Sequence, residues 1–193
     1  GPRDVFVLNG YAGTGKTSVV GALIGALRQL RRPVVLLAPT GRAAKVAAGF
    51  AGQPASTIHR RLYRPVGAPG DGRWFVAPNE ARDTLFIVDE ASLINDGAGD
   101  ISNSLLATLV KYVYSAPGCR MMLVGDEAQL PPVGQTVSTA MNADRLRRLG
   151  LNPICHSLDV PVRQAAGSGI IHNATAVRGY LAQLPPDKVG HLF

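Results

Sequence analysis

The fold of this protein is decided by the stretch Gly10-Tyr11-Ala12-Gly13-Thr14-Gly15-Lys16-Thr17. It matches the pattern G-x-x-x-x-G-K-[ST], whose glycines let a loop curl until successive backbone N–H groups point at phosphate oxygens. The stretch follows an apolar run of strand length at 5–8 and precedes residues 16–30, whose apolar side chains recur at helical spacing. It therefore predicts a phosphate-binding loop that joins a buried strand to a helix.

The loop and the first turn of the helix assign roles to single residues. Lys16 would place a positive charge between the β- and γ-phosphates of a nucleoside triphosphate, and the hydroxyl of Thr17 would be a magnesium ligand. The helix N-terminus adds the positive end of its dipole. We expect nucleotide contacts from Gly10, Ala12, Gly13, Thr14, Gly15, Lys16, Thr17 and Ser18.

Three more apolar runs of strand length follow, at 34–37, 85–88 and 121–124. None alternates with polar residues, so each predicted strand is expected to be buried on both faces. Helical patterns over 41–50 and 102–114 lie between them, which indicates crossover connections. The sequence therefore predicts an α/β fold with a mainly parallel sheet and helices on both faces.

Two carboxylates end the third of these strands, in Phe86-Ile87-Val88-Asp89-Glu90. In a parallel sheet they would reach the same carboxyl edge as the phosphate loop. Asp89 is expected to hold magnesium through water, and Glu90 is expected to polarise the attacking water as a general base. Such a pair alone is typical of a solvated strand end, but downstream of a phosphate-binding loop the catalytic interpretation is favoured.

The fourth strand ends in Gly125-Asp126-Glu127-Ala128-Gln129, followed by Leu130-Pro131-Pro132. The side chain of Gln129 can both donate and accept a hydrogen bond, which suits it to detecting a γ-phosphate. A structural turn stiffened by proline would explain the same residues.

Composition narrows the class of partner. The net charge is +7, and residues 1–75 hold eleven Lys and Arg against two acidic residues. This basic half indicates a polyanionic partner such as nucleic acid, although the excess of Arg over Lys could also reflect genome composition. No run of 18 apolar residues exists to span a membrane. Cys119 and Cys155 lack metal-ligand spacing and are expected to be buried free thiols in a reducing cytoplasm.

Six blocks in this order resemble the motifs of superfamily 1 DNA helicases, in particular the 5′-to-3′ RecD-like group that contains the exodeoxyribonuclease V alpha subunit. GYAGTGKTS (10–18) resembles motif I, LLAPTGRAAKVAA (36–48) motif Ia and ASTIHRRLY (55–63) the next DNA-contacting block. FIVDEAS (86–92) resembles motif II, LVGDEAQLPPV (123–133) motif III and VPVRQAAGSGIIHNA (160–174) motif IV. The resemblance covers residues 5 to about 178.

This resemblance implies a RecA-like P-loop motor that uses ATP and Mg²⁺ to move along single-stranded DNA and unwind duplexes. Gln129 would couple the nucleotide to the DNA track, and Arg163 would reach the γ-phosphate. The phosphates of the strand would be contacted by Pro39, Thr40, Gly41, Thr57 and His59. A small inserted hairpin, expected at 64–83 around Trp74-Phe75, would act as a strand-separating wedge or pack onto the domain.

Some family features do not match. No segment resembles motifs V and VI, so the resemblance implies that residues 1–193 are a first RecA-like motor domain, a fragment that works with a second one. The glutamine block that precedes motif I in the family is absent, and the acidic residue before Arg163 is found only as Asp159. Subunits of a nuclease complex are further expected partners. Two other classes stay open: a P-loop ATPase that remodels RNA or protein, and a non-catalytic nucleotide-binding module.

Overall fold

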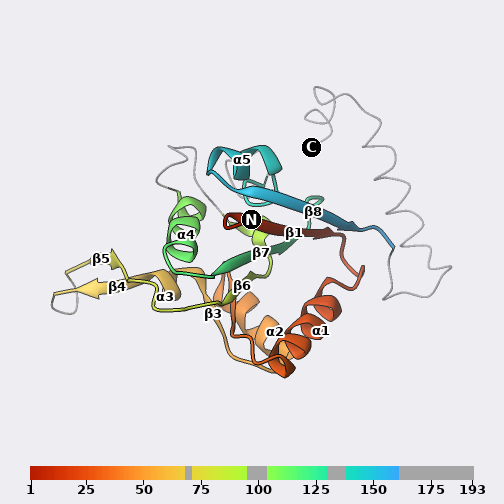
Figure 1. Cartoon of the computed structure of the whole chain (residues 1–193), viewed down its shortest axis with the longest axis horizontal. Helices are drawn as coiled ribbons and strands as arrows, with labels where there is room; N and C mark the ends of the chain where they lie inside the picture. Colours follow the sequence, from red (N-terminus) through yellow and green to blue (C-terminus); the bar gives the residue numbers. More distant parts are fainter. Residues whose placement is uncertain (68–70, 95–103, 130–137, 161–193) are drawn as a thin grey trace.

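The computed structural model describes residues 1–67, 71–94, 104–129 and 138–160 (Figure 1). The elements in chain order are β1 (Asp4–Gly10), α1 (Lys16–Gln29), β2 (Val34–Ala38), α2 (Gly41–Ala51), β3 (Ala55–Thr57), α3 (Ile58–Leu62), β4 (Tyr63–Val66), β5 (Arg73–Val76), β6 (Leu85–Val88), the 3-10 turn η1 (Ala91–Leu93), α4 (Leu105–Tyr114), β7 (Arg120–Gly125), α5 (Ala143–Arg148) and β8 (Asn152–Leu158).

A six-stranded sheet in the order β3-β2-β6-β7-β1-β8 forms the centre of the molecule, and every pairing in it is parallel. β1 lies between β7 and β8, so the phosphate loop leaves the middle of the sheet. The predicted α/β fold with a parallel sheet is confirmed, and it has the arrangement of a RecA-like P-loop domain. Because all six strands run the same way, all their carboxyl ends meet at one edge.

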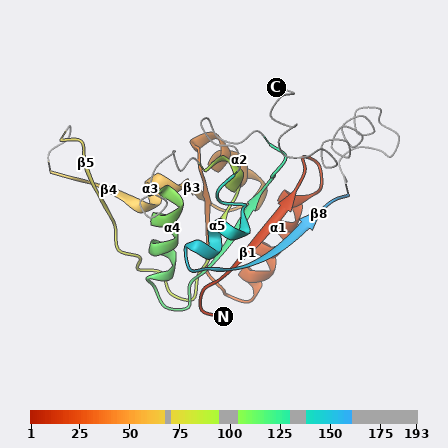
Figure 2. The same ribbon diagram turned by 90° about the horizontal axis from the view of Figure 1, so that it is seen from above.

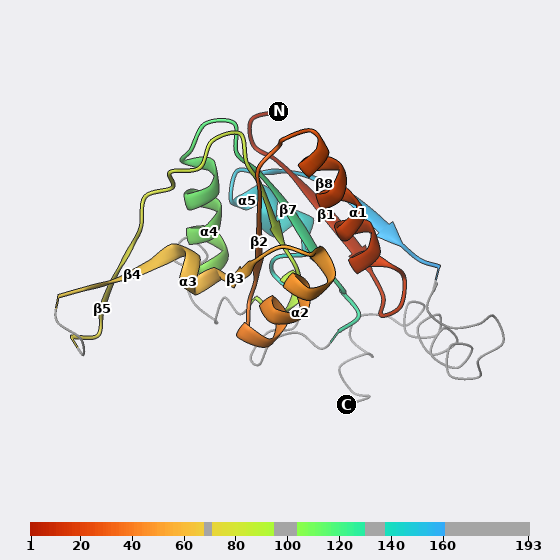
Figure 3. The ribbon, with the colours of Figure 1, turned by 90° about the horizontal axis from the view of Figure 1, so that it is seen from below.

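Helices cover both faces of this sheet. α1 and α2 pack on one face, where Val20 and Ile24 meet Leu8 and Ile87 (Figures 1 and 3). α3, α4 and α5 pack on the other face, around Val5, Val7 and Phe86. Successive residues of β1 thus enter different cores, which is why its sequence shows no polar alternation.

Two strands of the sheet were not predicted, and they are its edges. β3 has three residues, which is too short for a recognisable pattern. β8 contains Pro153, which an edge strand tolerates because only one of its sides is paired. Edge position also corrects the prediction for Cys155, whose thiol is exposed on β8, whereas Cys119 is buried as expected.

The segment at 64–83 contains the expected hairpin, formed by antiparallel β4 and β5. It projects from the end of α3, away from β8 at the opposite edge of the sheet (Figures 1 and 2). Trp74 is 63% exposed and Phe75 is 47% exposed. Burial of these two rings against the domain, one of the two interpretations open from the sequence, therefore does not occur.

Within the described residues, no helix has the length and apolar character needed to cross a membrane.

Candidate functional site

The phosphate loop needs glycine at three positions, for two physical reasons. Gly13 and Gly15 have φ of 86° and 89°, the left-handed region that glycine adopts without a Cβ penalty. Gly10 has ordinary dihedrals, but a Cβ there would lie 2.6 Å from Thr14 Oγ1 and 3.1 Å from Leu158 Cβ. Thr14 and β8 therefore leave no room for a side chain at Gly10, the first residue of the loop.

Hydrogen bonds inside the loop hold its shape. The backbone N–H and the hydroxyl of Thr14 both donate to the Tyr11 carbonyl, at 3.2 and 2.8 Å. The ammonium of Lys16 donates to the carbonyls of Gly10 and Tyr11. Thr14 is 4% exposed, so its side chain shapes the loop from inside. Ala12 and Ser18 are exposed.

The two carboxylates of the β6 end lie near this loop. Burial raises the pKa of Asp89, while the backbone N–H of Glu90, which donates to Asp89 Oδ1 at 3.0 Å, and the charge of Lys16 lower it. The pKa of Glu90 is raised by burial and then by the charge of Asp89. Lys16 also acts on Glu90, so one cation faces both acids. A raised pKa brings a carboxylate closer to the range useful for a general base.

Glu90 has an unusual backbone. Its φ is 52° and its ψ is 37°, a left-handed conformation that caps the 3-10 turn η1. Non-glycine residues in such regions cost roughly 1–3 kcal/mol, and they concentrate at functional sites.

Gln129 reaches the same place from the loop after β7. Its side chain lies in the same pocket wall as the Glu90 carboxylate and lowers the pKa of Glu90. Gln129, Glu90, Asp89 and Thr17 line one pocket of about 370 Å³. Thr40 lines it as well, so the structure brings together five of the residues that the sequence singled out, although they come from four separate segments of the chain.

The same pocket contains residues that the sequence analysis missed. Arg42, Val46 and Phe50 line it together with Thr40, Ala43 and Leu93. The spacing of 42, 46 and 50 places these three on one face of α2, which is a pattern visible in the sequence. Its meaning depends on the fold, because nothing local says that this face of α2 looks toward the carboxylates.

A magnesium ion fits the donors at this pocket. The hydroxyl of Thr17 and the carboxylate of Asp89 are both in its wall. Hard cations prefer oxygen ligands, and Mg²⁺ is usually held by one or two carboxylates together with substrate phosphates.

The two segments expected to meet DNA lie side by side. β2 and β3 are parallel neighbours with Ala38 paired to Thr57, so 39–41 and 57–59 follow adjacent strand ends on the edge that carries the phosphate loop. Thr40 Oγ1 accepts from the Ala43 N–H at 3.2 Å, and Thr57 Oγ1 accepts from the Arg60 N–H at 3.1 Å. Both threonines are therefore N-caps of the following helices, a use that the sequence analysis did not assign.

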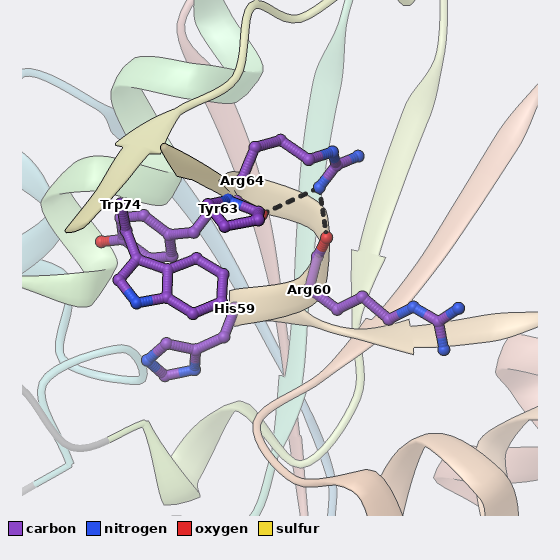
Figure 4. Close-up of a pocket in the computed structure, with 6 residues that line it drawn as sticks. His59, Arg60, Tyr63, Arg64 and Trp74 are labelled. Carbon is purple, nitrogen blue, oxygen red and sulfur yellow. Dashed lines mark hydrogen bonds between the residues drawn. The ribbon is translucent and has the colours of Figure 1, made fainter. Parts of the chain in front are cut away.

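A second pocket, of about 810 Å³, adjoins the 57–59 segment. The end of α3 and the two strands of the hairpin form it, with lining residues His59, Arg60, Tyr63, Arg64, Pro65 and Trp74 (Figure 4). The rings of His59 and Tyr63 lie 5.8 Å apart between centroids at 31°. Figure 4 shows the three rings grouped together, with the Arg60 and Arg64 side chains extending away from them.

Arg64 also fixes this corner of the structure. Its guanidinium donates to the carbonyls of Arg60 and Tyr63, at 2.6 and 3.0 Å. The hairpin is thereby tied to the last turn of α3. Arg163, the remaining predicted site residue, lies outside the described residues.

Comparison with known proteins gives the family. The sequence matches the family model described as AAA domain over residues 1–178. It is 34% identical over 187 residues to the ATP-dependent RecD2 DNA helicase of Deinococcus radiodurans, an alignment that covers 94% of this chain and 24% of that protein. It is 31% identical over 151 residues to the RecBCD enzyme subunit RecD of Haemophilus influenzae, covering 66% of this chain and 22% of that protein.

A solved structure agrees with the fold. The crystal structure of the Pif1 helicase from Candida albicans superposes with a TM-score of 0.60 at 22% identity, covering 96% of this chain and 42% of that one. The chain spans about a quarter of the length of the two curated relatives above. The chain belongs to the AAA domain family, and within it to the RecA-like motor domains of the RecD-like superfamily 1 helicases.

Proposed function

We propose that the full-length protein is an ATP-dependent 5′-to-3′ helicase on single-stranded DNA, and that residues 1–193 are its first RecA-like motor domain. The observation that carries the proposal is the shared edge of the sheet. The pocket lined by Asp89, Glu90 and Gln129 also contains Thr40, which belongs to the first of the two segments proposed to meet DNA. Nucleotide chemistry and the proposed DNA track thus meet at one helix, α2.

The residues of the pocket support a direct hydrolysis of the γ-phosphate. A water attacks phosphorus in line with the bond to the β-phosphate oxygen, which leaves as ADP, and Glu90 accepts the proton that the water loses. Lys16 stabilises the charge that develops on the phosphate oxygens. Mg²⁺, held by Thr17 and Asp89, would neutralise phosphate charge. The Gln129 amide, in the same pocket wall, would orient the Glu90 carboxylate.

Two features support single-stranded nucleic acid as the partner. The segments 39–41 and 57–59 offer backbone and hydroxyl groups that suit phosphates, which position a strand without reading its sequence. Beside them, one pocket is lined by three rings, those of His59, Tyr63 and Trp74, and by two arginines, Arg60 and Arg64. An exposed ring is a platform for a base, and one stacked base contributes roughly 1–3 kcal/mol whatever its identity.

A second RecA-like domain is part of the proposal, because the chain spans about a quarter of its curated relatives. Arg163 would reach the γ-phosphate across the closed site. One relative is named as a subunit of the RecBCD enzyme, so subunits of a nuclease complex are candidate partners. As a DNA motor, the protein would work in the cytoplasm.

The decisive experiment measures ATP hydrolysis by the full-length protein with increasing single-stranded oligonucleotide. We expect the double substitution His59→Ala, Trp74→Ala to keep the basal rate and to raise the oligonucleotide concentration for half-maximal stimulation by roughly tenfold, because one stacked base is lost. Phe75→Ala is the matched control: Phe75 is an exposed aromatic on the same strand, outside the pocket. Lys16→Ala should abolish hydrolysis with and without DNA.

A different pattern would reject the proposal. Stimulation by RNA or by a protein but not by DNA would favour a remodelling ATPase, and ATP binding without any hydrolysis would favour a binding module. If His59→Ala, Trp74→Ala and Phe75→Ala respond alike to DNA, the ring pocket is not part of the track.

A further inference from the structure

Asn9, near the end of β1, and Glu127, in the loop after β7, form a reciprocal pair of hydrogen bonds. Asn9 Nδ2 donates to Glu127 Oε2 at 3.1 Å, and the Glu127 backbone N–H donates to Asn9 Oδ1 at 3.0 Å. Asn9 ends the paired register of β1 with β7, where its partner is Gly125. The amide side chain thus adds one more link between these strands, at the point where each becomes a loop.

The two loops that the pair joins are those of the nucleotide site. Asn9 immediately precedes Gly10, the first residue of the phosphate loop. Glu127 lies two residues before Gln129, whose side chain reaches Glu90. A displacement of Asn9 by the nucleotide would therefore be passed to the loop that positions the Glu90 carboxylate.

The loop between Glu127 and Gln129 is stiff enough to pass on such a displacement. Asp126 is 3% exposed, and its Oδ1 accepts from the Ala128 N–H at 2.9 Å. The Asp126 carbonyl accepts from the Gln129 N–H at 3.2 Å, which closes a turn. On the η1 side, the Asp126 N–H donates to Ser92 Oγ at 3.4 Å. Hydrogen bonds thus connect the turn to Ser92 beside β6 and to Asn9 on β1.

Lys16 connects the Asn9–Glu127 pair to the bound nucleotide. Its ammonium donates to the carbonyls of Gly10 and Tyr11, directly after Asn9. A bound γ-phosphate competes with these carbonyls for the ammonium, because its oxygens carry negative charge and a carbonyl oxygen carries only a partial charge. Release of the Gly10 carbonyl changes the restraint on the residue next to it.

We propose that Asn9 and Glu127 are a positioning pair for ATP hydrolysis, which holds the Gln129 amide against the Glu90 carboxylate and links that contact to the state of the phosphate loop. The proposal rests on the hydrolysis proposed above and deepens it. Neither residue touches the reacting atoms; both act through Gln129.

The test uses the full-length protein with saturating single-stranded DNA. Asn9→Ala should lower kcat roughly ten- to hundredfold, because small misplacements at a reacting centre cost that much. KM for ATP should change by less than about twofold, since the phosphate contacts remain. Glu127→Gln should stay close to the parent rate, because its amide oxygen can still accept from Asn9.

A reversed pair gives a stricter test of geometry. Asn9→Asp alone places a second carboxylate against Glu127 and should be as slow as Asn9→Ala. Adding Glu127→Gln supplies an amide donor, so the double variant should recover most of the parent kcat. Asn79→Ala is the matched control far from the site: it removes one donor, to the Tyr112 carbonyl at 2.9 Å, and one acceptor, for the Ala81 N–H at 3.1 Å. It should lower Tm with kcat unchanged.

Non-additivity decides whether the pair acts through Gln129. In a Gln129→Ala background, Asn9→Ala should cause no further loss of kcat. The proposal is overturned if the losses of kcat in Asn9→Ala and Gln129→Ala multiply in the double variant. It is also overturned if kcat is unchanged in Asn9→Ala, or if Asn79→Ala lowers kcat as much as Asn9→Ala does.

Hydrogen exchange separates this proposal from the proposed function. The amides of residues 126–129 should exchange faster in Asn9→Ala than in the parent, with or without hydrolysis. Unchanged exchange would reject the pair even if the parent is an active ATPase. If exchange is faster in Asn9→Ala but the parent itself does not hydrolyse ATP, the proposed function is rejected. The catalytic role of the pair is then rejected with it.

Discussion

At the scale of single residues, Glu90 shows how burial and backbone strain serve chemistry. Burial raises the pKa of its carboxyl group, and its backbone is left-handed, with a φ of 52°. The result is two adjacent acids with different surroundings: Asp89 carries the hydrogen bond from the Glu90 N–H, and Gln129 lowers the pKa of Glu90. This division matches one metal ligand and one base.

Glu90→Gln tests that division. The amide keeps the shape and the contact with Gln129 but cannot accept a proton, so ATP and Mg²⁺ should bind normally while kcat falls by roughly 10²–10⁴-fold. Binding is measured by titration calorimetry and hydrolysis by phosphate release, with the exposed Glu80→Gln as control. Lost binding with normal turnover of the remaining complex would show that Glu90 is a metal or structural residue.

At the scale of elements, the β1–loop–α1 unit depends on close approach. β8 lies against β1 along seven paired residues, from Asp4 with Asn152 to Gly10 with Leu158. The last of these pairs leaves no room for a side chain at Gly10. The phosphate loop is therefore shaped partly by a strand about 140 residues away in the sequence.

Two glycine-to-alanine substitutions distinguish the effect of this close packing on stability from the effect of reduced backbone freedom. Gly10→Ala must displace Thr14 and Leu158, and it should lower the free energy of unfolding by about 1–3 kcal/mol and weaken ATP binding. Gly25→Ala lies in the interior of α1 with no atom within 4 Å of its new Cβ, and it should stabilise by about 0.5–1 kcal/mol. Denaturant unfolding of the 193-residue chain measures both; equal effects would show that the contact with β8 is unimportant.

At the scale of the whole molecule, the fold distributes the basic side chains between the two ends of the parallel strands. Its carboxyl edge carries the phosphate loop and both segments that we propose to meet DNA, and the ring pocket beside them contributes Arg60 and Arg64. Arg31 and Arg32 lie just before β2, at the opposite edge. A basic composition therefore becomes a directed surface only through the fold.

The salt dependence of DNA binding tests this sorting. Each lost phosphate contact on a single strand should make the slope of log K against log salt shallower by about 0.7. Arg60→Gln with Arg64→Gln should therefore flatten the slope, whereas Arg31→Gln with Arg32→Gln, an equal change in net charge, should leave it unchanged. Fluorescence anisotropy at several salt concentrations measures it; equal slopes would mean that binding follows net charge alone.

The sequence by itself determined the features that depend on local chemistry. The phosphate loop, the four central strands and the Asp89-Glu90 pair were all readable, because glycine conformations, double-sided burial and strand ends leave a short-range pattern. The hairpin at 64–83 was expected from the resemblance to the helicase family. The edge strands β3 and β8 were not, because an edge strand is short or solvated and carries no such pattern.

Only the tertiary structure decided how these parts meet. Thr40 and Thr57 cap neighbouring helices because β2 and β3 pair, and Trp74 lies near His59 and Tyr63 because β5 returns antiparallel to β4. Arg42 lines the nucleotide pocket, and Asn9 contacts Glu127, because the fold brings together segments that are far apart in the sequence. Such contacts arise when parallel strands bring their ends to one edge, and that arrangement depends on the packing of both cores rather than on any residue's neighbours in sequence.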